Sequence, residues 1–528
     1  MDDLYKIIAS VVTAMLLCFG TRALIGVMQQ GGYKNTPFFR WLKGKENLFF
    51  NRLAVLSLCL FLAAAVTSLC FSFLRVEEAL MVSSVPFFGL CFAFAWAAGK
   101  YALKVPLKNT GRSNRLFVAY LILTAAAGCG IIYFLGWLNE KNGSHIYGLV
   151  AYLPFAIMPM LLPVILGLAN GIMSVFENAR NQKFVKHAGQ VLNECEITRI
   201  GVVGSYGKTS VKNILKTLLS EKYAVVETPA SYNTPMGIAK TVYSAEFANK
   251  QILIAEMGAR KQGDIAELCA LVKPDYAIFT GVCPQHIGTF GSLDKVFAEK
   301  SEILKCGAKT VVCGNGLREY IQGKNECVAY ADEVKNLALQ ATKTSFVLSV
   351  NGEEIAVETQ LLGEGNAENI ALCVKLCEKL GMTAEEIARG IAKILPVAHR
   401  LQLIENGGVY ILDDGYNCNP RGAKQAIDAL CRFDGKKCVV TPGIIECGVL
   451  EESINAELGE YIAKAGLDKV ILVGETLVTA VKNGYVAAGG DASKLKIVKT
   501  LDGAKPILAE ILHAGDAVLF LNDLPDLY

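Results

Sequence analysis

RIGVVGSYGKTSVKNILKTLL, residues 199–219, carries the clearest structural signal in this chain. An apolar run is followed by a short glycine loop and then by an amphipathic helix, which is the order found in loops that bind nucleotide phosphates. Gly204 and Gly207 let the backbone N–H groups turn inward. Lys208 supplies a cation for the β and γ phosphates, and Thr209 offers a hydroxyl to Mg²⁺. The loop has the short form GxxGKT and predicts binding of ATP or GTP by Gly204, Ser205, Gly207, Lys208, Thr209 and Ser210.

The first third of the chain is unusually apolar. Across all 528 residues, 52% are hydrophobic and 19% are charged, which is more apolar than ordinary soluble proteins. Five runs are each about 20 residues long, enough to cross the hydrocarbon core: residues 7–27, 53–74, 80–99, 116–137 and 147–171. The first run has neither a basic flank before it nor a clear cleavage site, which argues against a signal peptide. We expect an α-helical membrane domain of about five transmembrane helices over residues 1–175.

The charges between these runs predict an orientation. Basic residues collect in alternate loops, namely Lys34, Arg40, Lys43, Lys45 and Arg52 after the first run, and Lys100, Lys104, Lys108, Arg112 and Arg115 after the third. Loops rich in lysine and arginine stay in the cytoplasm. Five crossings of the cell (inner) membrane then place the N-terminus outside and everything after about residue 172 in the cytoplasm, where ATP is available. Residues 176–195 are expected to form an amphipathic connecting helix at the membrane surface.

Strand-like runs alternate with helix-like runs beyond residue 195, which is typical of α/β domains with parallel sheets. The expected strands are residues 199–203, 223–226, 251–256, 276–280 and 309–313, followed by a β-rich segment at 346–358 and a helix at 366–380. A second α/β domain is expected near residue 400, with strands at 408–413, 436–441, 469–473 and 517–521. The predicted limits are 196–400 for a central ATP-binding domain and 401–528 for a Rossmann-like C-terminal domain.

Three residues after the phosphate loop point to metal-assisted chemistry. Glu256 ends an apolar run, a position from which a carboxylate reaches the Mg²⁺ that Thr209 also contacts. His286 and Lys300 are fourteen residues apart, with a glycine turn and a helix start between them. Each alone has a plainer interpretation, as a structural carboxylate, a hydrogen-bonded histidine and a solvated lysine. Their occurrence after a phosphate loop favours a functional role.

Cysteine and charge patterns exclude some classes of site. The seventeen cysteines include no CxxC pair, so neither disulfides nor structural zinc is expected. Cys373 and Cys377, four residues apart on a predicted helix, are interpreted as core residues. The net charge of +3 is explained largely by the basic loops between the apolar runs. Nothing in the charge pattern indicates binding to nucleic acid.

Seven motifs occur in the order seen in Mur ligases: GSYGKTS, SYNTPMGI, AEMGARKQGDIAEL, HIGTFGSL with AEKSEI, GEGNAENI, HRLQ and DDGYNCNP. The similarity runs from about residue 196 to 510, and the sequence most resembles the MurF type, which adds D-alanyl-D-alanine to the muramoyl peptide of peptidoglycan precursors. The resemblance implies an ATP-dependent amide (peptide) ligase with a P-loop central domain and a Rossmann-like C-terminal domain. A substrate carboxylate would become an acyl phosphate, and an amine would then attack it, releasing ADP and phosphate overall.

The resemblance also assigns roles to residues. Lys208 and Thr209 would hold the phosphates and a first Mg²⁺, with Glu256 as its acidic ligand. His286 would face a second Mg²⁺, and Lys300 would carry a carbamate, which is an anionic oxygen ligand. The remaining implied contacts are Asn366 and Asn369 with adenine, Arg400 with the transferred phosphate, Asp414 with ribose, and Asn233 and Asn417 with the substrate. The implied catalytic residues are Lys208, His286, Lys300 and Arg400.

The chain departs from the family pattern in several places. Apolar runs replace the domain that grips the UDP end of the precursor, Gly365 replaces a common histidine, and His399 replaces a usual glycine. The last predicted strand is not followed by the Lys-Gly-Ser-Arg stretch that helps to hold substrate. The acceptor therefore stays open: it would be a cell-wall peptide precursor, UDP-linked or lipid-linked, that is joined to an amino acid or dipeptide.

Two other functions fit the same sequence. A poly-γ-glutamate or capsule-type amide ligase would share the core and the membrane association. A catalytically idle membrane scaffold with a retained nucleotide fold is disfavoured by the joint presence of the phosphate-loop, acidic, histidine, lysine and arginine positions. Pro154, Pro159 and Pro163 in the last apolar run are spaced to distort a helix. They fit either a kinked anchor or a membrane region that presents a lipid-linked precursor.

Overall fold

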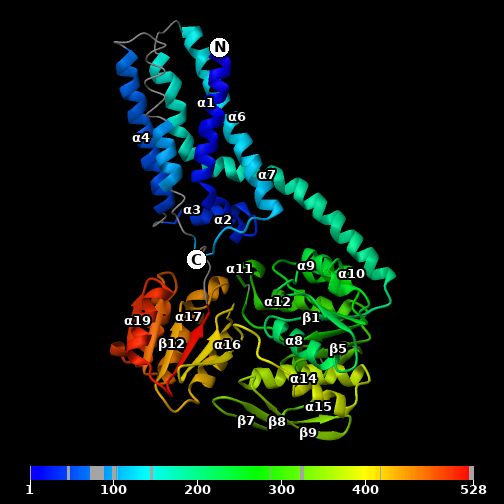
Figure 1. Ribbon diagram of the computed structural model, residues 1–528. Helices are drawn as coiled ribbons and strands as arrows, with labels where there is room; N and C mark the ends of the chain where they lie inside the picture. The colour runs from blue at the N-terminus through cyan, green and yellow to red at the C-terminus, as the bar shows by residue number, and fades with distance from the viewer. Residues whose placement is uncertain are drawn as a thin grey trace. The chain divides into compact units, whose positions relative to one another are not determined.

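The computed structural model describes residues 2–44, 48–71, 88–97, 103, 105–142, 147–285, 287–321, 326–416 and 418–522. The chain divides into two compact units between Asn181 and Gln182. We call residues 2–181 the helical unit and residues 182–522 the α/β unit. Figure 1 follows the chain from blue at the N-terminus to red at the C-terminus.

The helical unit contains α1 (Asp2–Gly20), α2 (Arg22–Gln30), α3 (Asn35–Leu42), α4 (Leu48–Phe71), α6 (Gly111–Asn142) and the first part of α7 (Tyr147–Glu194). Its apolar core includes Leu17, Met28 and Tyr120, all fully buried. Thr21 separates α1 from α2. Its hydroxyl donates to the Leu17 carbonyl at 2.8 Å and lies 2.9 Å from the Tyr120 hydroxyl. These partners satisfy the polar groups that the bend places in an apolar core.

Two helices among the described residues are long and apolar enough to cross a membrane, Gly111–Ile131 within α6 and Ala156–Glu194 within α7. A third candidate span results if Ser10–Gly20 and Arg22–Gln30, which are bent by 50°, are counted as one. The described part of the chain therefore supports two or three spans rather than the expected five.

The other two expected runs give shorter apolar helices, Phe50–Ala63 and Phe88–Ala97. Both runs, 53–74 and 80–99, extend into residues outside the described ranges. A span needs about 20 residues in one helix. The structure therefore tests these two predicted spans only over their described parts.

Helix α7 is continuous from Tyr147 to Glu194. The segment expected as a separate connecting helix, 176–195, continues α7 without a break as far as Glu194. Pro159 and Pro163 also lie inside this helix. Its last part belongs to the α/β unit, where Ala188 and Leu192 are buried in one cluster with residues of β2, β3 and α9.

The central domain is built on a six-stranded parallel sheet with the order β2-β3-β1-β4-β5-β6. The strands are β1 (Thr198–Val203), β2 (Val225–Glu227), β3 (Ile252–Glu256), β4 (Tyr276–Phe279), β5 (Thr310–Cys313) and β6 (Val328–Tyr330). The helices are α8 (Lys208–Leu219), α9 (Pro235–Val242), α10 (Asp264–Val272), α11 (Ile287–Phe290), α12 (Leu293–Lys300), α13 (Arg318–Ile321), α14 (Glu364–Lys379) and α15 (Ala384–Ile391). All five residues of β3 are buried, as expected for a parallel strand covered on both faces.

A small antiparallel sheet completes the central domain, with β7 (Lys335–Leu339), β8 (Thr344–Val350) and β9 (Glu353–Thr359) in that order. Alternate residues of β8 are buried, and Phe346 and Leu348 share one core with α8 and α14. Helix α14 lies between this sheet and the parallel sheet in Figure 1. Cys373 and Cys377 are fully buried on α14, which confirms their interpretation as core residues.

The C-terminal domain has a second six-stranded sheet with the order β10-β11-β15-β12-β13-β14, in which only the β10–β11 pair is antiparallel. The strands are β10 (Gln402–Asn406), β11 (Val409–Asp414), β12 (Lys437–Thr441), β13 (Lys469–Val473), β14 (Leu495–Val498) and β15 (Ala517–Leu521). Helices α16 (Pro420–Leu430), α17 (Glu451–Lys464) and α18 (Val478–Ala487) share one core on one face. Helix α19 (Leu501–Ile511) covers the other face. The domain is therefore a three-layer α/β sandwich.

The strands expected from apolar runs are present in both domains, with ends that differ by two residues or fewer. Four further strands, β6, β7, β10 and β14, were not expected. Each lies at the edge of its sheet. Their side chains are mostly half-buried or exposed, so their sequences lack the apolar pattern that reveals a strand.

Candidate active site

The phosphate loop connects the end of β1 to the start of α8. Gly207 is the N-cap of α8 with a φ of 72°, and a Cβ there would lie 2.8 Å from Asn369 Oδ1. A Cβ at Gly204 would lie 1.9 Å from Thr280 Oγ1. Glycine is required at both positions because neighbouring groups fill the space of a side chain. The loop thus leads into a helix N-terminus whose free N–H groups and positive dipole end suit an anion.

Lys208 opens α8 and folds back over the loop. Its Nζ donates a hydrogen bond to the Gly204 carbonyl at 2.8 Å. Burial lowers the pKa of Lys208, the Glu256 carboxylate opposes this shift, and Arg400 adds to it. Two cations next to a helix N-terminus create a positive site, which favours binding of phosphate.

Glu256 ends β3 and is 2% exposed. Thr209 Oγ1 donates to Glu256 Oε2 at 3.0 Å, and Asn233 Nδ2 donates to Glu256 Oε1 at 3.1 Å. A hydroxyl and a carboxylate therefore meet beside the phosphate loop. Such hard oxygen ligands suit Mg²⁺. Asn233, expected at the substrate cleft, contacts this carboxylate.

Lys300 ends α12 with a side chain that is 1% exposed. Burial lowers the pKa of its amine to about 7, and Lys208 shifts it in the same direction. Glu299, the preceding residue, accepts hydrogen bonds from the N–H groups of Gly263 and Ile265 at 2.7 Å each. Near neutral pH a large share of Lys300 is thus a neutral amine.

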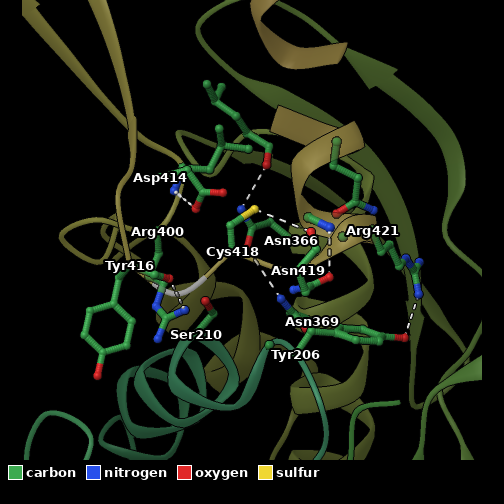
Figure 2. Close-up of a pocket in the computed structure, with 16 residues that line it drawn as sticks. Tyr206, Ser210, Asn366, Asn369, Arg400, Asp414, Tyr416, Cys418, Asn419 and Arg421 are labelled. Carbon is green, nitrogen blue, oxygen red and sulfur yellow. Dashed lines mark hydrogen bonds between the residues drawn. The ribbon is translucent and has the colours of Figure 1, made fainter. Parts of the chain in front are cut away.

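A pocket of about 100 Å³ adjoins the phosphate loop and is lined by both domains of the α/β unit (Figure 2). The residues of the expected site that line it are Gly207, Ser210, Asn366, Asn369, Arg400 and Asp414. Figure 2 shows Arg400, Asp414 and Tyr416 on one side of the pocket and Tyr206 and Arg421 on the other. His286 and Asn417 lie outside the described residues, so their expected roles stay predictions.

The wall of the pocket on the side of Arg400 is formed by the segment that enters the C-terminal domain. Burial raises the pKa of Asp414 to about 6, against the opposing effect of Arg400. Asp414 Oδ1 accepts a hydrogen bond from the Leu401 N–H at 3.0 Å. Arg400 donates to the Tyr416 carbonyl at 3.1 Å and lies over the Tyr416 ring. His399 has a φ of 61°, which explains why a glycine is usual at this position.

The opposite wall contains residues that the sequence did not single out. Arg421, on α16, donates to the Tyr206 hydroxyl and to the Glu368 carboxylate, each at 2.6 Å. Its guanidinium also lies over the Tyr206 ring. Burial raises the pKa of Tyr206 and that of Glu368. Tyr206 lies inside GSYGKT and Arg421 directly follows DDGYNCNP, so proximity to a motif was the available signal.

Further contacts join the two domains around the site. Ser231 Oγ lies 2.7 Å from the Tyr416 hydroxyl. Helix α11 meets the short helix η4 (Gly448–Leu450) through glycine backbone, because a Cβ at Gly448 would lie 2.6 Å from the Gly288 backbone nitrogen. These contacts join the central domain to the C-terminal domain.

Comparisons with known proteins agree with this geometry. The profile of the Mur ligase middle domain matches residues 202–377, and that of the Mur ligase, glutamate ligase domain, matches residues 399–522. The UDP-N-acetylmuramoyl-tripeptide--D-alanyl-D-alanine ligase of Bacillus subtilis is 29% identical over 297 residues, which cover 54% of this chain. The matched region spans 64% of the length of that relative, so the similarity is to part of the relative.

Solved structures show the same relationship. MurF ligase from Thermotoga maritima, solved in complex with ADP, is 28% identical with a TM-score of 0.58, over 65% of this chain and 80% of that one. MurF from Acinetobacter baumannii, at 24% identity, shows the same fold with a TM-score of 0.58 over 65% of this chain and 77% of that one. Together the two matched domains occupy more than half of the chain. Residues 202–377 and 399–522 are the middle and C-terminal domains of a Mur ligase, and this chain belongs to that family.

Proposed function

We propose that this protein is an ATP-dependent amide ligase that joins an amino acid or dipeptide to a carboxylate of a cell-wall peptide precursor. The observation that carries the proposal is the contact between Thr209 and Glu256 at 3.0 Å. It lies directly beside the phosphate loop, with Lys208 at the same helix N-terminus. A structural loop needs neither a buried carboxylate at a strand end nor a cation facing it.

The residues fit ATP and Mg²⁺. Gly204 and Gly207 form a cradle that a Cβ would fill, and Lys208 adds a charge for the β and γ phosphates. Asp414, Asn366 and Asn369 line the pocket, where Asp414 would contact the ribose and the two asparagines would contact the base. Thr209 and Glu256 would hold Mg²⁺, which supplies charge stabilisation as phosphate is transferred.

The same site accommodates the two steps of amide synthesis. An acceptor carboxylate oxygen attacks the γ-phosphorus, the bond to ADP breaks, and an acyl phosphate forms. The amine of the second substrate then attacks the acyl carbon, phosphate leaves, and the amine loses a proton. Arg400, which lines the pocket, is placed to neutralise charge on the transferred phosphate.

We also propose that Lys300 is used as a carbamate. The neutral amine nitrogen attacks the carbon of CO₂ and releases one proton, which converts the amine into an anionic carbamate with oxygen ligands. The buried position of Lys300 and the low pKa of about 7 that burial causes favour the neutral amine. The product would serve a second Mg²⁺, with His286 as a further predicted ligand.

The acceptor is proposed from the relatives. The Bacillus subtilis relative is named for UDP-N-acetylmuramoyl-tripeptide and D-alanyl-D-alanine, and this pair is the first choice for an assay. The full-length protein in detergent should release ADP only when both substrates are present. A lipid-linked form of the same peptide is the second candidate, since apolar helices precede the ligase domains. Better use of the lipid-linked form would make it the acceptor. If neither the UDP-linked nor the lipid-linked form supported ADP release, the cell-wall assignment would be overturned.

We further propose that the helical unit lies in the membrane and that the α/β unit is cytoplasmic. The support is the two apolar helices of span length and the basic residues that flank them, such as Arg112, Arg115 and Arg180. A reporter fused to the C-terminus should read as cytoplasmic. A protein that stays in the soluble fraction after cell lysis, or a C-terminus outside the cell, would overturn this placement.

A further inference from the structure

Lys212 lies on α8, one turn beyond Lys208, and its side chain is 1% exposed. It is among the largest fully buried side chains of the described residues. Burying an ammonium group costs several kcal/mol unless other polar groups replace water. A buried lysine this close to the phosphate loop therefore needs an explanation from its partners.

The partners of Lys212 come from two other segments. Its Nζ donates to the carbonyl oxygens of Thr228 and Ala230 at 2.6 Å each, and it lies 3.6 Å from Glu256 Oε2. Two of the three N–H donors of the ammonium group are used in these hydrogen bonds, and the contact with Glu256 is an ion pair. Lys212 thus ties α8 to the end of β3 and to the loop 228–234.

The loop 228–234 carries polar groups toward the reaction centre. Asn233 donates to Glu256 Oε1 at 3.1 Å, and the Ser231 hydroxyl lies 2.7 Å from that of Tyr416 in the C-terminal domain. Between the two lysine-bound carbonyls the chain turns sharply, since Ala230 has a φ of 44°. Residues other than glycine rarely adopt this left-handed conformation. The hydrogen bond from Lys212 to the Ala230 carbonyl helps to hold the chain in it.

We propose that Lys212 is a positioning residue that sets the loop 228–234 and the Glu256 carboxylate in one arrangement. The inference rests on the proposed function, in which Glu256 serves Mg²⁺ and Asn233 lies on the acceptor side. Lys212 fixes one carboxylate oxygen directly and the other through Asn233. The side chain of Lys212 would therefore align Glu256, which serves Mg²⁺, with Asn233, which lies toward the acceptor.

The alternative is that Lys212 only stabilises the fold. An apolar side chain of similar length would then lower the stability, because removing one partner of a buried ion pair leaves the other charge uncompensated, but it would leave the rate per folded molecule unchanged. The positioning role differs in kind: misplacement of reacting groups by about 1 Å lowers the rate about 100-fold while the protein stays folded.

The test compares Lys212→Met with Lys216→Met in the full-length protein. Lys216 is one turn further along α8, 45% exposed, and paired with Glu227 at 3.2 Å, so it controls for loss of a lysine on this helix. ADP release with UDP-N-acetylmuramoyl-tripeptide and D-alanyl-D-alanine gives kcat and KM for ATP. Hydrogen exchange reports the backbone amides of the loop 228–234. Affinity for ATP without Mg²⁺ reports the phosphate loop alone.

For Lys212→Met we expect kcat to fall about 100-fold, KM for ATP to stay within about threefold, and loop exchange to rise at least about tenfold. Lys216→Met should leave all three near wild type. A Lys212→Met protein with wild-type kcat, with unchanged loop exchange, or with lost ATP affinity overturns the inference. If Lys212→Met does not fold, Lys212→Gln, which keeps an N–H donor, replaces it in the test. The expected result is the same: kcat falls and KM for ATP stays nearly unchanged. A wild-type protein that neither binds ATP nor releases ADP overturns the proposed function instead.

Discussion

The two domains of the α/β unit contribute to the site in different ways. In the central domain, Lys208, Glu256 and Lys300 lie at helix or strand ends, and their partners belong to the same domain. In the C-terminal domain, Arg400 and Tyr416 lie on irregular segments, and Tyr416 is 45% exposed. The C-terminal side chains reach the phosphate loop across the interface, as Arg421 does through Tyr206.

The two domains of the α/β unit therefore contribute different groups to the candidate site. In the central domain, the side chains that we propose to bind phosphate and Mg²⁺ are positioned by elements of that domain's own sheet. The C-terminal domain completes the pocket by docking. Changes in the central domain should therefore abolish turnover, whereas changes at the docked wall should weaken nucleotide binding and leave the bound rate closer to wild type.

The largest effect should come from Lys208→Ala in the central domain. Lys208 is the cation of the phosphate loop, and loss of one such contact costs roughly 3–4 kcal/mol, or about 100–1,000-fold in rate. We expect that loss in ADP release, with an unchanged circular dichroism spectrum. Near wild-type ligation by this variant is the result that would remove the phosphate-loop assignment.

Lys300→Ala should lower turnover by about 100-fold if an anionic oxygen is lost from the metal site. Added acetate or formate should restore part of the rate, because either supplies a carboxylate to the vacated space. Lys300→Met, which fills that space, should not be rescued. Full activity of the alanine variant would instead make Lys300 a buried structural residue.

Arg421→Leu tests the wall of the pocket that the C-terminal domain contributes. The variant loses the hydrogen bonds to Tyr206 and Glu368 and the stacking on the Tyr206 ring. We expect KM for ATP to rise about tenfold, with kcat within about threefold. In a double-mutant cycle with Tyr206→Phe the two changes should be non-additive by about 1 kcal/mol. A fall in kcat as large as that of Lys208→Ala would erase the proposed division between the domains.

The smallest effect is a pH dependence that belongs to the central domain. Burial lowers the pKa of Lys300 to about 7, so the neutral fraction should rise about fourfold between pH 6.5 and pH 8. Bicarbonate-dependent activity should rise with it. An unfolded lysine titrates near 10.4, so the unfolded state binds more protons between pH 7 and pH 10, and the contribution of Lys300 to the free energy of unfolding grows with pH in that window. Lys300→Met should remove the contribution of Lys300 to the pH dependence of the activity and to that of the free energy of unfolding.

Much of the α/β unit could be predicted from the sequence because its strands are buried. β1, β3 and β12 are apolar runs between helices, and such runs reveal parallel strands. The edge strands β7 and β10 were missed because their side chains face solvent. In the helical unit the described residues give two or three candidate spans, and apolar composition did not reveal the bend of 50° between α1 and α2.

The candidate site also contains residues that the sequence predicted and residues that it did not. That Thr209 and Glu256 lie together beside Lys208 was predictable, because a phosphate loop follows one strand and the acidic residue ends another. Tyr206, Arg421 and Lys212 were not, because their roles depend on contacts between distant segments: Arg421 lies 215 positions from Tyr206, and Lys212 looks like an ordinary helix lysine. Sequence patterns report local geometry well and long-range side-chain partners poorly.

The meeting of Gly288 and Gly448 has a practical consequence for enzymology. A Cβ at Gly448 would collide with backbone rather than with a movable side chain, and its φ of 60° already disfavours other residues. We therefore expect Gly448→Val to prevent the C-terminal domain from packing against the central domain. Gly448 is not among the residues that line the pocket. Such a protein should bind nucleotide more weakly, because the wall with Arg400 and Asp414 no longer completes the pocket, and it should not proceed to ligation. Any ligand that it still binds would be held by the central domain alone, which would separate the contributions of the two domains to binding.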